Sequence, residues 1–418
     1  MSSSIKAQNP KWDGHTDRIG YLCVVGMPLA CLLNVLTVAK VSGLSIRPSD
    51  LLFVGATTAW ALRIITKLRI QRNQLLPICL LIFFLLIEAV GFLFLGNQVD
   101  WAKSFRFVQT MFWGVLALTF LRSEVRFHRL IHNIIITCVI MAGLSIYLYI
   151  ENPLLQRIVG YVSAAGGQGL GRQASYNEWG ALYALIITVL LWRSWHRGLS
   201  KIQWLALAVL AVGLLLDQSR SALLALGLCA LLLSSTNLKG VFIGRFDKKT
   251  VIMTIGFICA TLVGAAILNH LSINRISESF APGSNAQESI QVRLILWRES
   301  LIFWTADDSL PRFLLGVGNK SLSNFIQGPT TDSFYLDHGV SHGFLGLLAL
   351  LTIVVAPGLQ AWSAGNFVKE ASLGMLVVII CLTVSLTGNV LVDPTYGGIS
   401  FLLLYGFLSI RTAKKSSS

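Results

Sequence analysis

The sequence predicts an all-α fold: a polytopic integral membrane bundle of about twelve transmembrane helices, with a large loop that contains amphipathic helices. Three observations predict it, namely the composition, the length of the apolar segments and the distribution of basic residues. Of the 418 residues, 54% are hydrophobic and only 12% are charged, which is too apolar for a soluble domain of this length. The composition therefore indicates an integral membrane protein.

The apolar segments set the expected order of elements, because a helix that spans a bilayer needs about 20 apolar residues. The segments lie at about 19–41, 49–66, 75–96, 104–121, 131–150, 176–193, 202–217, 220–236, 250–269, 342–361, 371–391 and 395–411. The expected division is a cytoplasmic segment 1–18, helices 1–9 over 19–269 with a periplasmic loop at about 151–176, a large periplasmic loop 270–336, helices 10–12 over 337–411, and a cytoplasmic tail 412–418.

Basic residues predict the orientation of these segments. If both termini lie inside, the inner loops carry most of the Lys and Arg residues, as the positive-inside rule requires. The inner set is Lys67, Arg69, Arg72, Arg122, Arg126, Arg129, Arg193, Arg197, Lys201, Lys239, Arg245, Lys248, Lys249, Lys369, Arg411, Lys414 and Lys415. The net charge of +14 is therefore attributed to topology, and no nucleic-acid partner is expected.

The long loop 270–336 departs from the positive-inside rule, because it places basic residues on the outer side. These residues are Arg275, Arg293, Arg298, Arg312 and Lys320. An anionic substrate would account for them. Within this loop, RLILWRESLIFW has apolar residues at helical spacing with charges between them, so we expect an amphipathic helix on the outer membrane face.

Three arginines at expected outer positions are candidates for binding phosphate. Arg220 begins the eighth apolar segment, Arg293 lies in the expected amphipathic helix, and Arg172 precedes the sixth segment. A planar guanidinium can hold a pair of phosphate oxygens, and converging arginines would match a pyrophosphate. The alternatives are an interfacial side chain that snorkels for Arg220 and a solvated helix face for Arg293.

Several other polar residues have both a functional and a structural interpretation. Asp332, near the start of the tenth segment, is a candidate general base or simply a helix N-cap. His338 and His342 are candidates for proton transfer, although a lone histidine is more often structural. Glu88 and Arg63 fall inside apolar segments, where charges are costly and functional by default. The sequence does not indicate whether these two side chains meet.

No cofactor is expected. The glycines of GGQGLGR at 166–172 lack the strand–glycine–helix context and the GK[ST] ending of a phosphate-binding loop. The seven cysteines fall in apolar segments without a metal-binding spacing.

Four segments, taken in order, resemble the O-antigen polymerase and O-antigen ligase superfamily, over about residues 160–360. They are GRQASYNEWGAL at 171–182, QSRSALLAL at 218–226, RLILWRESL at 293–301 with LLGVGNKSLSNF at 314–325, and DSFYLDHGVSHGFLG at 332–346. The resemblance implies a metal-independent, inverting glycosyltransferase of the bacterial inner membrane, with its active site facing the periplasm. Its donor would be a glycan on undecaprenyl pyrophosphate, held by Arg220 and Arg293.

The resemblance also implies roles for the remaining candidates. Asp332 would activate or position the acceptor hydroxyl. The other residues of these segments that would bind substrate are Arg172, Asn177, Trp297, Arg298, His338 and His342. The expected partners are the lipid-linked oligosaccharide, membrane lipid and a chain-length regulator.

Three functions stay open. Ligases of the family carry a histidine eleven residues before the first glycine of Gly-x-x-Gly, and here that position is Asp332. We therefore expect a polymerase of lipid-linked repeat units for an O-antigen or exopolysaccharide. A ligase that transfers the glycan to lipid A-core is the second interpretation. The third is a transporter of lipid-linked polysaccharide, against which the lack of a visible internal repeat counts.

Overall fold

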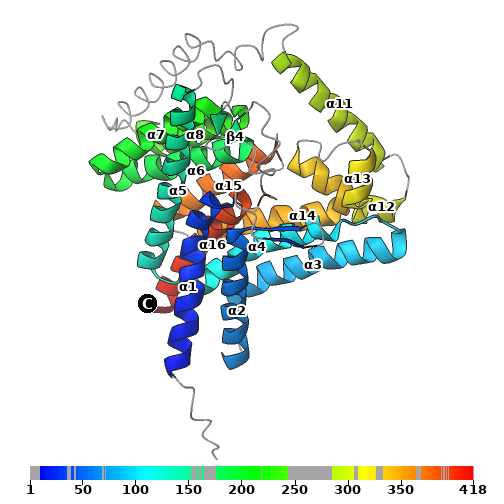
Figure 1. The fold of residues 1–418 in the computed structure, drawn as a ribbon, viewed down its shortest axis with the longest axis horizontal. Coiled ribbons are helices and arrows are strands. Elements are labelled where there is room, and N and C mark those ends of the chain that lie inside the picture. Colours follow the sequence, from blue (N-terminus) through cyan, green and yellow to red (C-terminus); the bar gives the residue numbers. More distant parts are fainter. Residues whose placement is uncertain are drawn as a thin grey trace, which may run out of the picture.

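The structure is a computed structural model in which the chain is described at residues 10–34, 39–41, 44–67, 70, 72–151, 158–159, 162–163, 176–217, 219–242, 285–305, 309–325, 333–363, 369–386, 388, 391, 393 and 395–417. Its architecture is helical, with two short hairpins between helices (Figure 1). The hairpins are β1 (Ala39–Val41) with β2 (Leu44–Ile46) and β3 (Ile158–Val159) with β4 (Val162–Ser163), both antiparallel.

The helices follow the apolar segments of the sequence. They are α1 (Pro10–Leu32), α2 (Pro48–Lys67), α3 (Arg72–Leu95), α4 (Trp101–Phe120), α5 (Glu124–Glu151), α6 (Tyr176–Arg197), α7 (Lys201–Asp217), α8 (Arg220–Phe242), α11 (Asn285–Thr305), α12 (Leu310–Leu315), α13 (Asn319–Phe325), α14 (Phe334–Ser363), α15 (Lys369–Ser385) and α16 (Tyr396–Ser417). Eleven of the twelve expected segments overlap a helix, and the segment expected at 250–269 lies outside the described residues. The helix expected at RLILWRESLIFW is α11.

The first expected segment is displaced toward the N-terminus. A helix was expected at 19–41, but α1 ends at Leu32 and Ala39–Val41 forms β1. The chain leaves the helix through a turn in which the Asn34 Oδ1 accepts a hydrogen bond of 3.2 Å from Ser49 N at the start of α2. The β-branched residues that follow favour an extended chain over a helix.

Three of the described helices are long and apolar enough to cross a membrane: Asn73–Leu95, Glu124–Glu151 and Phe334–Gln360. Three shorter apolar helical stretches accompany them, Arg220–Ala230, Leu373–Ser385 and Tyr396–Ile410. The fold is thus compatible with a membrane protein.

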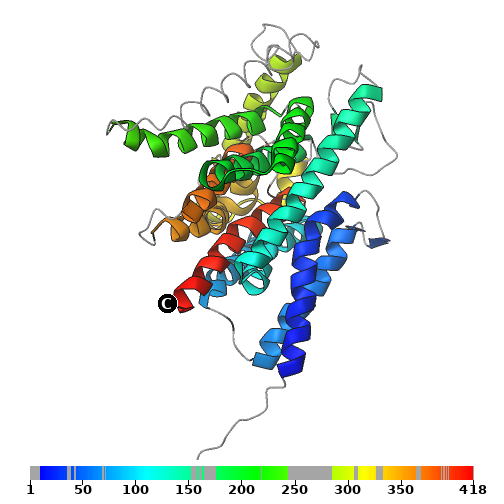
Figure 2. The ribbon, with the colours of Figure 1, turned by 90° about the vertical axis from the view of Figure 1, so that its left-hand side faces the viewer.

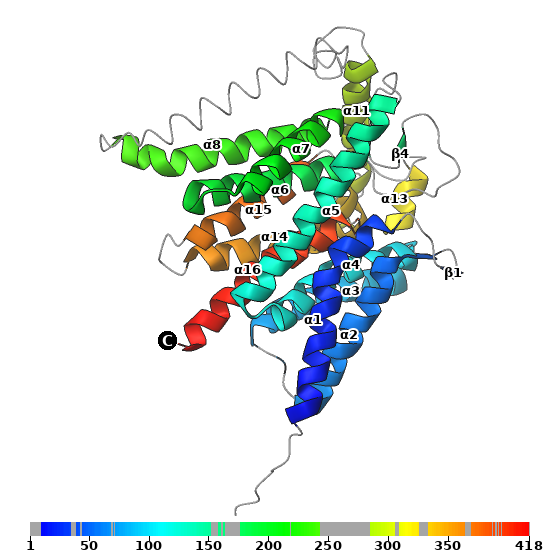
Figure 3. The ribbon, with the colours of Figure 1, turned by 60° about the vertical axis from the view of Figure 1, so that its left-hand side comes forward.

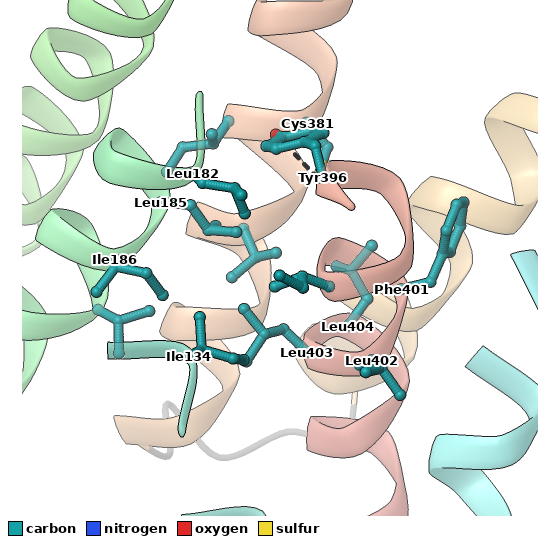
Figure 4. Packing of buried hydrophobic residues seen from close by; sticks show 14 of the residues in the cluster. Ile134, Leu182, Leu185, Ile186, Cys381, Tyr396, Phe401, Leu402, Leu403 and Leu404 are labelled. Carbon is teal, nitrogen blue, oxygen red and sulfur yellow. Dashed lines mark hydrogen bonds between the residues drawn. The ribbon is translucent and has the colours of Figure 1, made fainter. Parts of the chain in front are cut away.

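The core lies where α16 packs among α4, α6 and α15. Figure 4 shows Leu403 of α16 beside Ile134 of α5, with Leu185 of α6 on the same side and Leu402 on the opposite side of α16. The α16 helix approaches α4 closely, because a Cβ at Gly114 would lie only 2.6 Å from the Tyr405 ring. These contacts fix α4, which reaches both polar clusters described below.

The helices are not all parallel, and α1 and α2 form an antiparallel pair beside α4 and α5 (Figure 2). Figure 3 shows α11, α13 and the two hairpins toward one side of the molecule and the C-terminus toward the opposite side. A separate group of helices, α3, α12, α13 and α14, lies together in Figure 1 and forms the candidate site.

Candidate functional site

The helix α14 is interrupted at Gly343. A span was expected to begin near residue 342, but α14 begins at Phe334 and Gly343 has non-helical dihedrals inside it (φ 70°, ψ −176°). The expected start therefore marks an interruption within a helix and not its beginning. An interrupted helix leaves backbone groups without intrahelical partners, and these must find others when they are buried.

The Gly-Val-Gly turn at 316–318 supplies those partners. Val317 N donates to Val340 O, and Gly318 N donates to Ser341 O, each at 2.9 Å. Both accepting residues lie just before the interruption. The turn is thus joined to α14 by hydrogen bonds between backbone atoms, in which no side chain takes part.

Glycines are required on both sides of this contact. Gly343 has a positive φ, and a Cβ there would overlap Leu314 O. Gly316 also has a positive φ of 78°, and a Cβ there would overlap Ser341 O. Only glycine combines this backbone conformation with such a close approach. The third and fourth segments of the resemblance therefore form one structural unit.

The loop between α3 and α4 holds the turn from a second direction. Asn97 Nδ2 donates to Gly316 O at 3.0 Å, and Lys320 N donates to Gln98 O at 3.1 Å. Asp100 N donates to Asn319 Oδ1 at 2.6 Å. Together these bonds fix α13 against the start of α4.

A chain of hydrogen-bonded side chains lies next to the interruption, and we term it the histidine–glutamate network (Glu88, Ser104, Asn319, His338 and His342). His338 Nδ1 lies 3.1 Å from His342 Nδ1, and His342 Nε2 lies 2.9 Å from Glu88 Oε1. Ser104 Oγ donates to Glu88 Oε1 at 2.6 Å, and Asn319 Nδ2 donates to Ser104 Oγ at 3.2 Å. The network thus joins α3, α4, α13 and α14.

Burial makes this network chemically distinct from a surface cluster. The side chains of His342 and Glu88 are only 5% and 2% exposed. Aromatic rings enclose the imidazoles: the Phe107 ring stacks on His338 with centroids 4.6 Å apart, and the Phe84 ring lies 4.6 Å from His342. In such surroundings a hydrogen bond is strengthened, and an unpaired polar group is costly.

One assignment of protons satisfies both contacts of the histidine rings. If Glu88 Oε1 accepts from His342 Nε2, the Nδ1 atom of a neutral His342 ring can only accept. His338 Nδ1 is then the donor in the contact between the two rings, and His338 Nε2 carries a lone pair. This nitrogen is buried and has no hydrogen-bond partner among the described residues. The arrangement is that of an oriented base, in which a carboxylate fixes the tautomer at a distance.

The candidate arginines lie on other helices. Arg220 is the first residue of α8 and is half-buried. On α11, Arg293 and Trp297 are half-buried and Arg298 is exposed. In Figure 1 the helices α8 and α11 are drawn apart at the top of the molecule.

The first two segments of the resemblance also touch each other. A Cβ at Gly180 of α6 would overlap the Asp217 carboxylate and would lie 2.7 Å from Ser219 Cβ, just before Arg220. Asn177 is the second residue of α6. Arg172 and Asp332 lie outside the described residues.

The sequence indicated some of these residues but not their connections. Glu88 and Arg63 do not meet: Glu88 bonds His342, and Arg63 forms an ion pair with Asp17. The only signal for the network was the i, i+4 spacing of the two histidines, which places them on one helix face. Ser104 and Asn319 were not indicated. Among the described residues, no group of three or more His, Cys, Asp or Glu side chains is arranged to hold a metal ion.

Comparison with known proteins does not assign the chain to a family. No protein-family model matches it, and no curated protein matches its sequence significantly.

Proposed function

We propose that this chain is a membrane glycosyltransferase that transfers a glycan from undecaprenyl pyrophosphate to an acceptor hydroxyl at the periplasmic face of the bacterial inner membrane. The observation that carries the proposal is the histidine–glutamate network, which presents an oriented ring nitrogen, His338 Nε2, beside the interrupted helix α14. The ordered resemblance of the surrounding segments supplies the reaction class.

The network supports a specific role in this reaction. His338 Nε2 accepts the proton of the acceptor hydroxyl while the hydroxyl oxygen attacks the anomeric carbon of the donor. The bond from that carbon to the pyrophosphate oxygen breaks, and undecaprenyl pyrophosphate leaves. His342 and Glu88 stabilise the imidazolium that forms on His338, because the proton on its Nδ1 remains bonded along the network.

The leaving group carries negative charge that must be balanced. Arg220 and Arg293 remain the residues proposed for this, on the strength of the resemblance and of their half-buried positions. No metal is invoked for the step. In the proposed topology the network lies toward the outer membrane face, because it occupies the start of α4 and α14 and the end of α3, and both termini lie in the cytoplasm.

The acceptor distinguishes two forms of this function. The register of Asp332 favours a polymerase, in which the acceptor is the next lipid-linked repeat unit of an O-antigen or exopolysaccharide, and a chain-length regulator would then be a partner. The second candidate is a ligase with lipid A-core as acceptor. The specific observation that favours the ligase is the base-like geometry of His338. This histidine lies six residues after the position, here Asp332, at which ligases of the resembled family carry theirs.

The test is the cell-surface polysaccharide profile of a deletion strain complemented with variants. The informative variants are His338→Ala, Glu88→Gln, Asp332→Ala, Arg220→Ala and Arg293→Ala. His128→Ala is the matched control, because His128 lies on the exposed part of α5 beside Glu124. We expect the His338, Arg220 and Arg293 variants not to restore the polysaccharide profile and the His128 variant to restore it.

The product that accumulates in the deletion strain identifies the acceptor. Single repeat units on the cell surface indicate the polymerase, and long lipid-linked chains that stay unattached indicate the ligase. Full activity of His338→Ala would refute the proposed base. An unchanged profile in the deletion strain would refute the glycosyltransferase.

A further inference from the structure

At the other end of α4 lie three basic side chains and one acidic side chain, which we term the arginine cluster (Arg63, Arg122, Arg126 and Asp17). Asp17 of α1 pairs with Arg63 of α2, and a longer contact of 3.9 Å joins it to Arg126 of α5. Arg126 also lies over the Tyr21 ring, 4.8 Å from its centroid, and donates to Phe120 O at 3.1 Å. Arg122 follows the end of α4 and lies among these elements.

The guanidinium of Arg122 is incompletely bonded. Its Nε and Nη2 atoms are buried, and within the described part of the chain neither has a hydrogen-bond acceptor. Burial, and then the nearby Arg63 charge, lowers the pKa of Arg122 from its usual value. Buried N–H groups of a cation are unfavourable without an acceptor, even where the side chain as a whole is half-buried.

The two unbonded atoms of Arg122 have the geometry of an anion-binding edge. Nε and Nη2 form one edge of the guanidinium, and their two hydrogens point in parallel. This edge matches two oxygens of a phosphate or carboxylate group. The described cluster holds three guanidinium groups and only the Asp17 carboxylate, so an additional anion would also improve the charge balance.

The surroundings of the cluster are apolar and exposed. Ile19 and Leu22 on α1 are 53% and 57% exposed, and Leu62 and Ile65 on α2 are 44% and 67% exposed. Ile19 lies two residues after Asp17 and Leu22 five residues after it, and Leu62 and Ile65 lie within two residues of Arg63. A phosphate that carried hydrocarbon chains could therefore place them along α1 and α2.

We propose that the arginine cluster is a phosphate-binding site on the cytoplasmic face, occupied by the headgroup phosphate of an anionic phospholipid. The Nε–Nη2 edge of Arg122 binds two phosphate oxygens, Arg63 and Arg126 supply the further positive charge, and the acyl chains cover the exposed residues of α1 and α2. The same chemistry would accept inorganic phosphate, which the experiment separates from lipid. The proposal does not rest on the glycosyltransferase activity.

The experiment uses the purified full chain, reconstituted with equal amounts of phosphatidylglycerol and phosphatidylethanolamine of the same acyl chains. Native mass spectrometry measures which lipid stays bound. A second arm measures the thermal shift of delipidated protein in inorganic phosphate. The variants are Arg122→Gln and the matched control Arg129→Gln, which removes one positive charge from an exposed position on the same helix as Arg126.

We expect the wild type and Arg129→Gln to retain phosphatidylglycerol preferentially, and Arg122→Gln to lose that preference about tenfold, the effect of one charge-assisted bidentate contact. If Arg122→Gln loses only the thermal shift in inorganic phosphate and keeps the lipid preference, the site is supported and its occupant is a soluble phosphate. Equal behaviour of the Arg122 and Arg129 variants in both arms would overturn the proposal. If Arg122→Gln does not fold, Arg122→Lys replaces it, and binding equal to the wild type then overturns the proposal.

Discussion

The histidine–glutamate network and the arginine cluster lie at opposite ends of α4, about 30 Å apart for a helix of 20 residues, and they differ in how their charges are balanced. In the network, one carboxylate is bonded to a histidine and a serine, and neutral rings carry the chain onward. In the cluster, three guanidinium groups share the carboxylate of Asp17.

The difference indicates what each region requires from outside the chain. In the network, His338 Nε2 and Glu88 Oε2 are buried without a hydrogen-bond partner among the described residues, and both are acceptors in the proposed arrangement. The cluster has fixed positive charge that no proton transfer removes at ordinary pH, so it requires an anion. A buried polar group without a partner can thus be poised to take up a proton, or it can be incomplete without a ligand. An open acceptor atom indicates the first case, and an open donor atom on a cation indicates the second.

The largest expected effect is at the interruption of α14. Gly343→Ala should lower the free energy of unfolding by about 3–5 kcal/mol, because it combines a positive φ with backbone overlap. Gly143→Ala in α5 is the control, since a Cβ there would meet nothing within 4 Å. It should change stability by less than about 1 kcal/mol. Thermal unfolding in detergent, followed by tryptophan fluorescence, measures both, and similar effects would show that the interruption is not tightly held.

Removal of the Glu88 carboxylate tests how much its hydrogen bonds contribute to the free energy of unfolding. Glu88→Ala leaves His342 Nε2 buried without its acceptor, whereas Ser104 Oγ can still donate to Asp100 O at 3.2 Å, so we expect a loss of about 1–3 kcal/mol of stability. Glu88→Gln keeps an acceptor oxygen and should therefore lose less stability than Glu88→Ala. Chemical unfolding of both variants provides the comparison, and equal losses would mean that the hydrogen bonds contribute little.

The start of α4 should respond more weakly. The Asp100 side chain caps this helix by accepting from Ala102 N and Lys103 N, at 3.1 and 3.3 Å. Asp100→Ala should therefore cost about 1 kcal/mol, whereas Asp100→Asn should cost little because asparagine caps helices well. The midpoint of urea unfolding measures the difference, and a full loss with asparagine would assign the effect to charge rather than to capping.

The smallest expected effect has the opposite sign. In delipidated protein, Arg122→Gln should raise stability by about 0.5–1 kcal/mol, because it removes a partly solvated cation that is repelled by Arg63. In anionic lipid the order should reverse. Unfolding measured with and without phosphatidylglycerol tests this sign change, and a variant less stable under both conditions would contradict it.

The sequence predicted the positions of the helices more accurately than the connections between them. Apolar segments locate α2 to α8 and α14 to α16, because hydrophobic length is a local property. The first segment was misplaced because residues 33–41 are apolar but rich in β-branched side chains, and hydropathy does not distinguish a helix end from a strand.

The site was predicted only in part for a physical reason. Both histidines and Glu88 were noticed individually, but His342 and Glu88 are 254 residues apart, and their contact depends on how α3 packs on α14. The Gly-Val-Gly turn was noticed as a motif, while its bonds to Val340 and Ser341 are set by tertiary structure. Arg122 looked like any other basic residue of an inner loop, since burial of its guanidinium edge leaves no trace in the sequence.

The bonds between the Gly-Val-Gly turn and α14 have a mechanical consequence. Val340 and Ser341 lie between His338 and His342, so the backbone that carries the two imidazoles is also the backbone that holds the turn between α12 and α13. A displacement of α12 and α13, for instance to admit a lipid-linked chain, would have to break these bonds or carry the histidine-bearing segment with it. Access to the site and alignment of its base are thereby coupled through two backbone hydrogen bonds.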